Sequence, residues 1–322
     1  MDKFIIAEIG VNHDGSYDKA IELVKKCKSF GASAVKFQHF YTDEIVQKDT
    51  DCADYQKDNG NYSNQYDMIK ELELSDIEIK KISEYCEEID IEFMATPFCV
   101  NSLNFLVDEC GMKRIKIGSG EIINHKLLFA AGTKSVPVIL STGMALDIEI
   151  ELAISQIIKG FISSAPVMHH DELLKLIIDF KKTISILHCT TAYPCPKNEA
   201  NLGEILRYKL MFPQHEIGFS DHTADNNAAM IASSMGANIF EKHVTYDKSA
   251  IGPDHKASLN INDFRDYINA ISLGKELASS EPNTLSISEK KNIMVARRSL
   301  HKIDSKIKAS RPYDGDSIFF EE

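Results

Sequence analysis

The chain alternates short apolar runs with longer segments in which apolar residues recur every three or four positions. Continuous apolar runs are typical of strands buried on both faces, and the longer spacing is typical of amphipathic helices. Eight strands are predicted: Phe4–Ile9, Ala34–Gln38, Ile91–Thr96, Arg114–Ile117, Val136–Ser141, Ile184–His188, Glu216–Ser220 and Asn238–His243. The predicted helices include Tyr17–Phe30, Asp76–Glu88, Asn101–Glu109, Asp147–Lys159, Leu202–Met211, Ala224–Met235 and Ile261–Leu277.

Strand–helix alternation repeated eight times predicts an α/β fold of the (β/α)8 barrel type, a TIM barrel. The alternative is a doubly wound sheet, which normally carries a GxGxxG phosphate turn after its first strand. The segment Glu8–Gly15 contains glycines in a different spacing, and the chain has no Walker sequence. The barrel is therefore favoured, and residues 1–280 are assigned to it.

Two segments interrupt this rhythm. Phe40–Leu74 is a long polar connection that, in a barrel, lies over the catalytic mouth and can act as a lid. Gly160–Thr183 lengthens the connection before the sixth strand and includes an extra helix, on the side that faces away from the active site. After Ser279 the sequence predicts a linker, a helix at Ser288–Ala296 and a basic, irregular tail.

Charge and cysteine usage narrow the class of protein. The net charge of −12 argues against nucleic acid and anionic membranes as partners. The apolar N-terminal stretch is too short for a signal peptide, and no window approaches a transmembrane span. Seven scattered cysteines without a CxxC pair indicate a reduced chain. We therefore expect a cytoplasmic protein.

Polar residues gather at the C-terminal ends of the predicted strands, where barrels place their active sites. In chain order these are Glu8, Lys36, Gln38, Thr96, Lys116, Ser119, Glu121, Ser141, His188, Tyr193, Ser220, His222, Glu241 and His243. A Cys–His nucleophile is disfavoured, because His188 and Cys189 are neighbours on a strand and face opposite sides.

Lys36 and Lys116 each interrupt an apolar run. A buried ammonium group costs several kcal/mol unless a counter-charge compensates it. Each lysine could pair with Glu8 or Glu121, or extend to solvent. Two lysines at equivalent strand ends, beside the glycine-rich Gly118–Gly120 segment, instead favour an anionic substrate such as a phosphate.

His222 and His243 follow the seventh and eighth strands. Each could be a hydrogen-bonded core imidazole, but paired placement beside Asp221 and Glu241 favours a divalent-metal site. Two nitrogen ligands with oxygen ligands leave open positions, which suits Mn²⁺, Mg²⁺ or Zn²⁺ acting as a Lewis acid.

The same strand ends resemble the bacterial sialic acid synthase family. The similarity lies in Ala7-Glu-Ile-Gly-Val-Asn-His13, Val35-Lys-Phe-Gln38, Ala95-Thr-Pro-Phe98, Ile115-Lys-Ile-Gly-Ser-Gly-Glu121, Leu140-Ser-Thr-Gly-Met144, His188-Cys-Thr-Thr-Ala-Tyr-Pro194, Phe219-Ser-Asp-His-Thr223 and Glu241-Lys-His243. Such enzymes condense phosphoenolpyruvate with an N-acyl amino sugar and release phosphate. The stretch Gly252–Ser258 resembles the neuraminic and legionaminic branches, so the sugar is N-acetylmannosamine or 2,4-diacetamido-2,4,6-trideoxymannose.

The resemblance implies a role for each matching residue. It implies phosphoenolpyruvate binding by Lys36, Thr96, Lys116, Ser119, Ser141 and Ser220. It implies sugar binding by Gln38, Tyr193 and Asp254, and a Mn²⁺ or Mg²⁺ ion on His222 and His243. It implies catalytic roles for Glu8, Glu121, Lys116 and Glu241, with proton transfer by Glu8 and Glu121. Thr191 departs from the Asn or Ser that relatives often carry.

The C-terminal region departs further from the family. Relatives end in an antifreeze-like domain that swaps onto the partner's barrel in a homodimer and contributes an arginine. Arg297–Glu322 contains Arg297-Arg-Ser-Leu300 and Arg311-Pro312, which resemble that domain, but fewer residues than its fold. Residues 281–322 are interpreted as a linker and a truncated antifreeze-like remnant, with Arg311 as a sugar-binding candidate.

Two alternative functions remain open. One is another phosphoenolpyruvate aldol synthase that makes a phosphorylated keto-acid, which requires a further basic cluster for the acceptor's phosphate. The other is a degenerate homologue that binds a sugar or a partner without turnover, through the Gly160–Thr183 insertion. The intact set of lysines, glutamates and histidines favours the enzyme.

Overall fold

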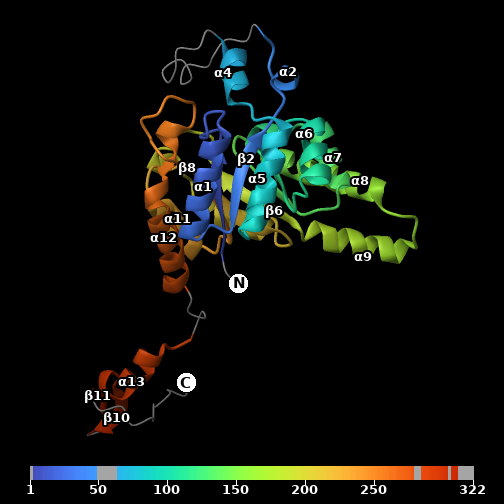
Figure 1. Cartoon of the computed structure of the whole chain (residues 1–322). Helices are drawn as coiled ribbons and strands as arrows, with labels where there is room; N and C mark the ends of the chain where they lie inside the picture. Colours follow the sequence, from blue (N-terminus) through green and yellow to red (C-terminus); the bar gives the residue numbers. More distant parts are fainter. Residues whose placement is uncertain (1–2, 49–63, 279–283, 304–305, 311–322) are drawn as a thin grey trace. The chain divides into compact units, whose positions relative to one another are not determined.

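Eight parallel strands form a nearly closed barrel surrounded by helices (Figure 1). This computed structural model describes residues 3–48, 64–278, 284–303 and 306–310. Hydrogen-bonded neighbours follow the order β3-β2-β1-β8-β7-β6-β5-β4, and β3 and β4 contact each other where the ring closes. The predicted (β/α)8 barrel is therefore confirmed.

All eight predicted strands are present within two residues of their predicted bounds. They are β1 (Phe4–Gly10), β2 (Ala34–His39), β3 (Glu92–Pro97), β4 (Ile115–Ile117), β5 (Val138–Ser141), β6 (Ile184–Cys189), β7 (Glu216–Asp221) and β8 (Ile239–Thr245). The helices around them are α1 (Tyr17–Phe30), α5 (Asp76–Glu88), α6 (Val100–Asn104, continued by a π-helical turn at Phe105–Glu109), α7 (His125–Thr133), α8 (Asp147–Ser164), α10 (Gly203–Met211), α11 (Asn227–Ser234) and α12 (Phe264–Leu277). The sequence pattern missed α7.

The two faces of the barrel sheet bury different cores. Outward-facing strand residues and the inner faces of the helices form one large apolar core. Inside the barrel a smaller cluster is formed by Ile6, Ala34, Met94, Ile139, Leu187 and Ile239. Because strands bury both faces in this fold, they read in the sequence as continuous apolar runs, which explains why they could be predicted.

The two unusual connections contain helices. The Phe40–Leu74 connection contributes α2 (Thr42–Ile45) and α4 (Gln65–Leu72), which lie over one end of the barrel (Figure 1). The expected extra helix in Gly160–Thr183 is α9 (His170–Lys181), which extends with α8 away from the barrel. None of the helices in the described residues combines the length and apolar composition that crossing a membrane requires.

The chain divides into two units, Met1–Glu276 and Leu277–Glu322. The second unit contains helix α13 (Ile287–Ala296), close to the predicted Ser288–Ala296 helix, and an antiparallel pair, β10 (Ser299–Ile303) and β11 (Lys306–Ser310). The expectation of an irregular tail was therefore wrong over β10 and β11. Arg311 lies outside the described residues.

Candidate active site

The polar residues of the site stand two positions beyond the apolar core inside the barrel. Side chains at positions i and i+2 of a strand share a face, so the interior residue and its second neighbour both point inward. The pairs are Ile6 and Glu8, Ala34 and Lys36, Met94 and Thr96, Ile139 and Ser141, Leu187 and Cys189, and Ile239 and Glu241. The strand pattern therefore places a polar layer directly above an apolar one.

In the seventh strand, β7, a glycine occupies the inward-facing position two residues before the polar one. Gly218 precedes Ser220 by two positions, and a Cβ atom on Gly218 would lie 2.5 Å from the Ile239 carbonyl oxygen. Only glycine allows β7 and β8 this close approach. The polar residues at the strand ends line a cavity of about 390 Å³, a size typical of small-molecule sites. All predicted site residues among those the structure describes line it, except Glu121.

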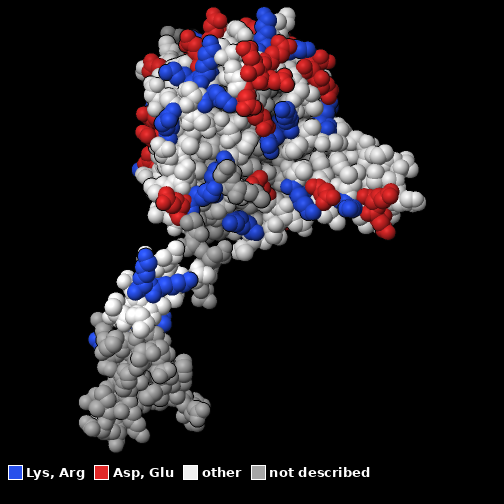
Figure 2. All heavy atoms as spheres, turned by 60° about the horizontal axis from the view of Figure 1, so that its bottom comes forward, with Lys and Arg blue, Asp and Glu red and all other residues white. Residues whose placement is uncertain are grey.

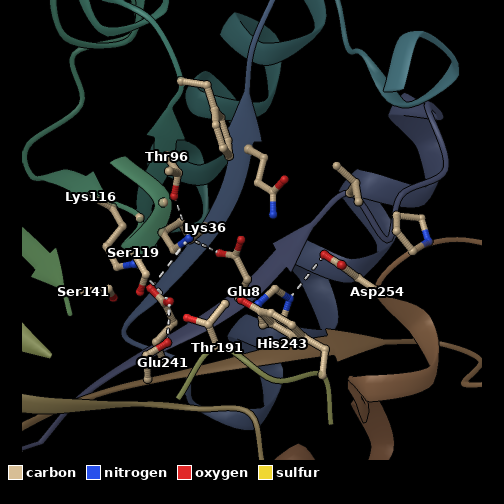
Figure 3. Close-up of a pocket in the computed structure, with 18 of the residues that line it drawn as sticks. Glu8, Lys36, Thr96, Lys116, Ser119, Ser141, Thr191, Glu241, His243 and Asp254 are labelled. Carbon is tan, nitrogen blue, oxygen red and sulfur yellow. Dashed lines mark hydrogen bonds and ion pairs between the residues drawn. The ribbon is translucent and has the colours of Figure 1, made fainter. Parts of the chain in front are cut away.

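Two buried lysines and two buried glutamates form the floor of the cavity. Lys36 Nζ lies 2.5 Å from Glu8 Oε2 and 3.6 Å from Glu241 Oε2, and Lys116 Nζ lies 3.3 Å from Glu241 Oε1. Figure 3 shows Lys36 between Glu8, Glu241 and Thr96. The structure thus contains the pairing of Lys36 with Glu8 that the sequence analysis gave as the alternative to an anionic substrate. For Lys116 the counter-charge is Glu241, because the barrel brings β4 and β8 together across its interior.

The two glutamates differ in protonation. Burial raises the pKa of Glu8 to about 7, with Glu241 adding to the effect of burial and Lys36 opposing it. Burial also acts on Glu241, but Lys116 and Lys36 outweigh it and lower the pKa of that carboxyl to about 2. Glu241 is therefore a permanent anion that holds both ammonium groups, while Glu8 can carry or release a proton near neutral pH.

Hydroxyl groups surround the lysines. Lys36 Nζ donates to Thr96 Oγ1 at 2.9 Å, and Ser220 Oγ donates to Glu241 Oε1 at 3.0 Å. The Gly143 N–H donates to Ser119 Oγ at 2.9 Å. Within the described residues, the buried hydroxyls of Ser141 and Thr191 have no hydrogen-bond partner. Buried hydroxyls usually have partners, so these two are free to bind a ligand.

The two histidines lie together at the ends of β7 and β8. Their ring centroids are 5.5 Å apart, and the Tyr193 ring lies 4.2 Å from His222 and 5.9 Å from His243. His222 Nδ1 donates to the Thr190 carbonyl oxygen at 2.8 Å, so Nε2 is an acceptor in the neutral ring. Cys189 Sγ also lies 3.7 Å from His222 Nδ1.

The histidines fit a divalent metal. Burial holds the pKa of His243 well below its usual value, so this imidazole is neutral and keeps a lone pair. Its buried Nδ1, 3.5 Å from Asp254 Oδ2, has no hydrogen-bond partner in the described part of the chain. Those residues contain no group of three or more His, Cys, Asp or Glu side chains arranged for a metal. His222 and His243 could supply two nitrogen ligands, and solvent or substrate would have to supply the others.

Gly10 lies next to the side chains of three polar lining residues. It has a φ of +57°, and a Cβ atom there would lie 3.3 Å from Glu8 Oε1 and 3.4 Å from both Gln38 Nε2 and Asp254 Oδ2. The absent side chain thus leaves a space bordered by two predicted sugar-binding residues and the proton-carrying glutamate. Asp254 points toward His243 from the loop after β8 (Figure 3).

Opposite this polar floor, the cavity has an apolar wall that the sequence analysis missed. We call Val11, Phe40, Ile45, Met68, Ile69 and Leu72 the apolar wall. Val11, Phe40 and Leu72 form a small buried cluster with Ile45, Ile69 and Phe98 packed on it. The long connection was predicted to be a polar lid, but its described lining residues are all apolar. Apolar positions spaced along Met68–Leu72 were the available signal.

One predicted site residue among those described, Glu121, is not in the cavity. It accepts a hydrogen bond from Asn124 Nδ2 at 2.7 Å. It follows β4 in the short helical turn Ser119–Glu121, where the period of two no longer applies. Thr191, which the sequence marked only as a departure from the family, does line the cavity.

The sequence matches the NeuB family over residues 23–281, most of the chain. The chain belongs to the NeuB family. It is 40% identical over 269 residues to the N,N'-diacetyllegionaminic acid synthase of Legionella pneumophila, covering 83% of this chain and 71% of that protein. It is 36% identical over 297 residues to the enzyme of the same name from Campylobacter jejuni, covering 92% and 83%.

The fold of this NeuB-family chain also matches that of a solved sialic acid synthetase. The crystal structure of the N-acetylneuraminic acid synthetase from Leptospira borgpetersenii superimposes with a TM-score of 0.76 and 29% identity, covering 91% of this chain and 90% of that one. The chain is thus a transferase of the sialic acid synthase type. Acidic and basic side chains are mixed on the face of the barrel drawn in Figure 2.

Proposed function

We propose that this chain condenses phosphoenolpyruvate and water with an N-acylated mannosamine-type sugar, giving a nine-carbon 2-keto acid and phosphate. The observation that carries the proposal is the meeting, in one cavity, of two buried ammonium groups and a pair of ligand-competent histidines. The first suits a small, doubly anionic substrate, and the second suits a carbonyl that needs polarisation.

Phosphoenolpyruvate binds on the Lys36 and Lys116 side. The ammonium groups pair with its carboxylate and phosphate, and the free hydroxyls of Ser141 and Thr191 donate to its oxygens. Thr96, Ser119 and Ser220 orient this group of donors. Glu241 remains anionic and holds both lysines in place.

The sugar binds between Gln38, Tyr193 and Asp254, with its open-chain aldehyde directed at the histidines. As the family resemblance implies, His222 and His243 would hold a Mn²⁺ or Mg²⁺ ion, which would supply Lewis-acid polarisation at that carbonyl. Carbon 3 of phosphoenolpyruvate then bonds to the aldehyde carbon, water adds at carbon 2, and phosphate leaves. Glu8, with its pKa near 7, holds the proton that must move between water and the new hydroxyl.

The lining residues argue against a phosphorylated acceptor. Among the described residues that line the cavity, Lys36 and Lys116 are the only lysines or arginines, and both are already needed for phosphoenolpyruvate. Within the described part of the chain, a second phosphate would therefore meet no cation of its own. A homodimer and a sugar contact from Arg311 stay predictions.

Phosphate release tests the proposal. The purified chain is incubated with Mn²⁺, phosphoenolpyruvate and, in separate reactions, N-acetylmannosamine, 2,4-diacetamido-2,4,6-trideoxymannose or a phosphorylated aldose. We expect release with at least one of the two N-acylated sugars, and loss of release in Lys116→Met. Release only with the phosphorylated aldose would identify another aldol synthase. No release with any sugar would identify a binding protein without turnover.

A further inference from the structure

The connection between β5 and β6 contains one helix more than a barrel needs. A single crossover helix completes the connection between two parallel strands, and α8 is that helix here. Helix α9 follows α8 and extends with it away from the barrel (Figure 1). The rings of Phe161 and Phe180 stack with centroids 3.9 Å apart and join the two helices. Helix α9 is therefore an addition to the barrel, attached to it through α8.

Most of α9 is not covered by the barrel. Among its twelve residues, all of which the structure describes, Phe180 is the only buried one. Leu174 and Ile178 are 45% and 52% exposed, and Val167, in the connection before α9, is fully exposed. The region of α8 and α9 projects to the right in Figure 2, and the face drawn there is largely uncharged, with charged side chains along one edge. Apolar side chains grouped on one projecting element indicate an interaction surface.

Four residues lie in one row along α9. Asp171, Leu174, Ile178 and Lys181 are spaced by three, four and three positions, so they share one side of the helix. We call these four residues the α9 stripe. An acidic residue begins the stripe, two exposed apolar residues form its middle, and a basic residue ends it. An acidic first turn and a basic last turn also suit the helix dipole, but the dipole does not account for the exposed apolar residues between them.

The α9 stripe is complementary to itself when it is reversed. In an antiparallel pair with a twofold axis midway between Leu174 and Ile178, Leu174 of one copy lies opposite Ile178 of the other. Asp171 of each copy then lies opposite Lys181 of the other copy. Because a twofold axis repeats every contact, the pairing gives two apolar contacts in the middle and an ion pair at each end. Lys175, at the edge of the stripe, is exposed and can extend into solvent.

We propose that the α9 stripe is a self-association surface, through which two copies of this chain pair by antiparallel contact of their α9 helices. A second copy fits better than an unrelated protein, because both the charges and the apolar positions of the stripe match their own twofold image. None of the described cavity-lining residues belongs to α9, so the pairing does not depend on the proposed catalytic function. Each α9 helix is only about 18 Å long, which is small beside the roughly 800 Å² per partner of a stable interface, so the association is weak.

Sedimentation equilibrium of the full chain from about 1 to 200 μM tests the pairing. We expect the average mass to rise with concentration, with a Kd on the order of 10 μM. Ile178→Glu places two carboxylates in the middle of the contact and should raise the Kd roughly 100-fold, because a change in a twofold interface acts twice. Ile77→Glu makes the same change at a 69% exposed position of α5 and should leave the Kd unchanged.

Charge reversal distinguishes pairing from an effect on the helix itself. Asp171→Lys and Lys181→Asp each place like charges opposite each other, and each should raise the Kd about 10-fold. The variant with both changes has opposite charges at both ends again, so its Kd should return to within about threefold of the wild-type value. Both changes oppose the helix dipole, so their effects on α9 alone would add in the double variant.

Three results would overturn the proposal. The first is a wild-type mass that does not rise with concentration. The second is equal association of Ile178→Glu and the wild type, including association that requires residues 278–322 instead. The third is a double charge variant that associates more weakly than either single variant. Neither Asp171 nor Lys181 is buried, so the charge variants decide the question even where Ile178→Glu fails to fold.

Discussion

Glu8 and Glu241 show how position within one cavity separates two identical carboxyl groups. Each is buried and each lies near Lys36, but only Glu241 also contacts Lys116. Lys116 and Lys36 outweigh burial and lower the pKa of Glu241, and the charge on Glu241 in turn disfavours a second anion at Glu8. The pair thus separates into a fixed anchor and a group that exchanges protons.

This division predicts the effect of neutral substitution at Glu8. Glu8→Gln keeps the size of the side chain but cannot accept a proton, so kcat should fall about 10²- to 10⁴-fold. Steady-state phosphate release measures it. Glu121→Gln is the matched control, because Glu121 bonds to Asn124 outside the cavity. We expect Glu121→Gln to change kcat only slightly. An equal loss of kcat in both variants would contradict the assignment of the proton to Glu8.

His13 provides a prediction about pH. Burial lowers its pKa to about 4, and its Nδ1 accepts the Gly15 N–H at 3.1 Å, so the folded chain holds it neutral. Between the ordinary histidine pKa near 6.5 and about 4, the unfolded chain binds a proton that the folded chain does not. The stability contributed by His13 is therefore complete above 6.5 and is lost as pH falls toward 4.

Urea unfolding of the wild type and His13→Gln at about pH 7 and about pH 4.5 measures this contribution. The wild type should lose up to roughly 3 kcal/mol more than the variant over that interval. An equal acid loss in the two proteins would show that His13 is not held neutral by the fold.

Among the elements, strands were predictable from the sequence and connections were not. The sequence of a strand such as β2 gives two kinds of information. Its apolar run predicts that the segment is a strand, and the alternation of side chains places Lys36 on the same face of the sheet as Ala34. A connection has no such period. Glu121 leaves the strand geometry of β4 and turns away, and the apolar residues of α4 were hidden in a segment whose average composition is polar. Helix α7 was missed between two short strands.

The elements β7 and β8 are held together behind the site by a second ion pair. Lys242 Nζ lies 3.1 Å from Asp221 Oδ2, and both side chains are nearly fully buried. Asp221 Oδ1 accepts from Thr223 N and Oγ1, and Lys242 Nζ donates to the Thr223 carbonyl oxygen. Each member of this pair is adjacent in the chain to a predicted metal ligand, so the pair fixes the strand ends that carry the histidines.

Removing one partner of the Lys242–Asp221 pair should therefore lower the free energy of unfolding more than removing both partners. Lys242→Met leaves a buried unpaired carboxylate and should lower the free energy of unfolding by about 3–5 kcal/mol. Lys242→Met combined with Asp221→Asn should recover part of that loss. Lys182→Met is the control, because Lys182 and Asp179 are 60% and 56% exposed and such pairs contribute about 1 kcal/mol or less. A loss in Lys242→Met no larger than the control would contradict the argument.

At the scale of the whole molecule, the sequence predicted which residues converge but not how the cavity is divided. Convergence follows from topology, since parallel strands of a barrel deliver their C-terminal ends to one mouth. The division into a charged floor and an apolar wall depends on α2 and α4 reaching back over that mouth, a long-range contact that no local pattern encodes. Net charge was equally uninformative about the cavity, because −12 is a sum over the whole chain and does not show where the two buried lysines lie.

The location of every described lining residue within Met1–Glu276 leads to a prediction for the whole chain. The first unit contains both apolar cores and all the described side chains proposed to bind phosphoenolpyruvate and the metal. A chain ending at Leu277 should therefore fold, and phosphoenolpyruvate with Mn²⁺ should stabilise it as much as the full chain, by about 2.7 kcal/mol at 100 times Kd. Thermal unfolding of both chains with and without ligands measures this. Loss of ligand stabilisation in the shortened, folded chain would show that residues 278–322 complete the site, and Arg311→Ala in the full chain would then test the predicted arginine.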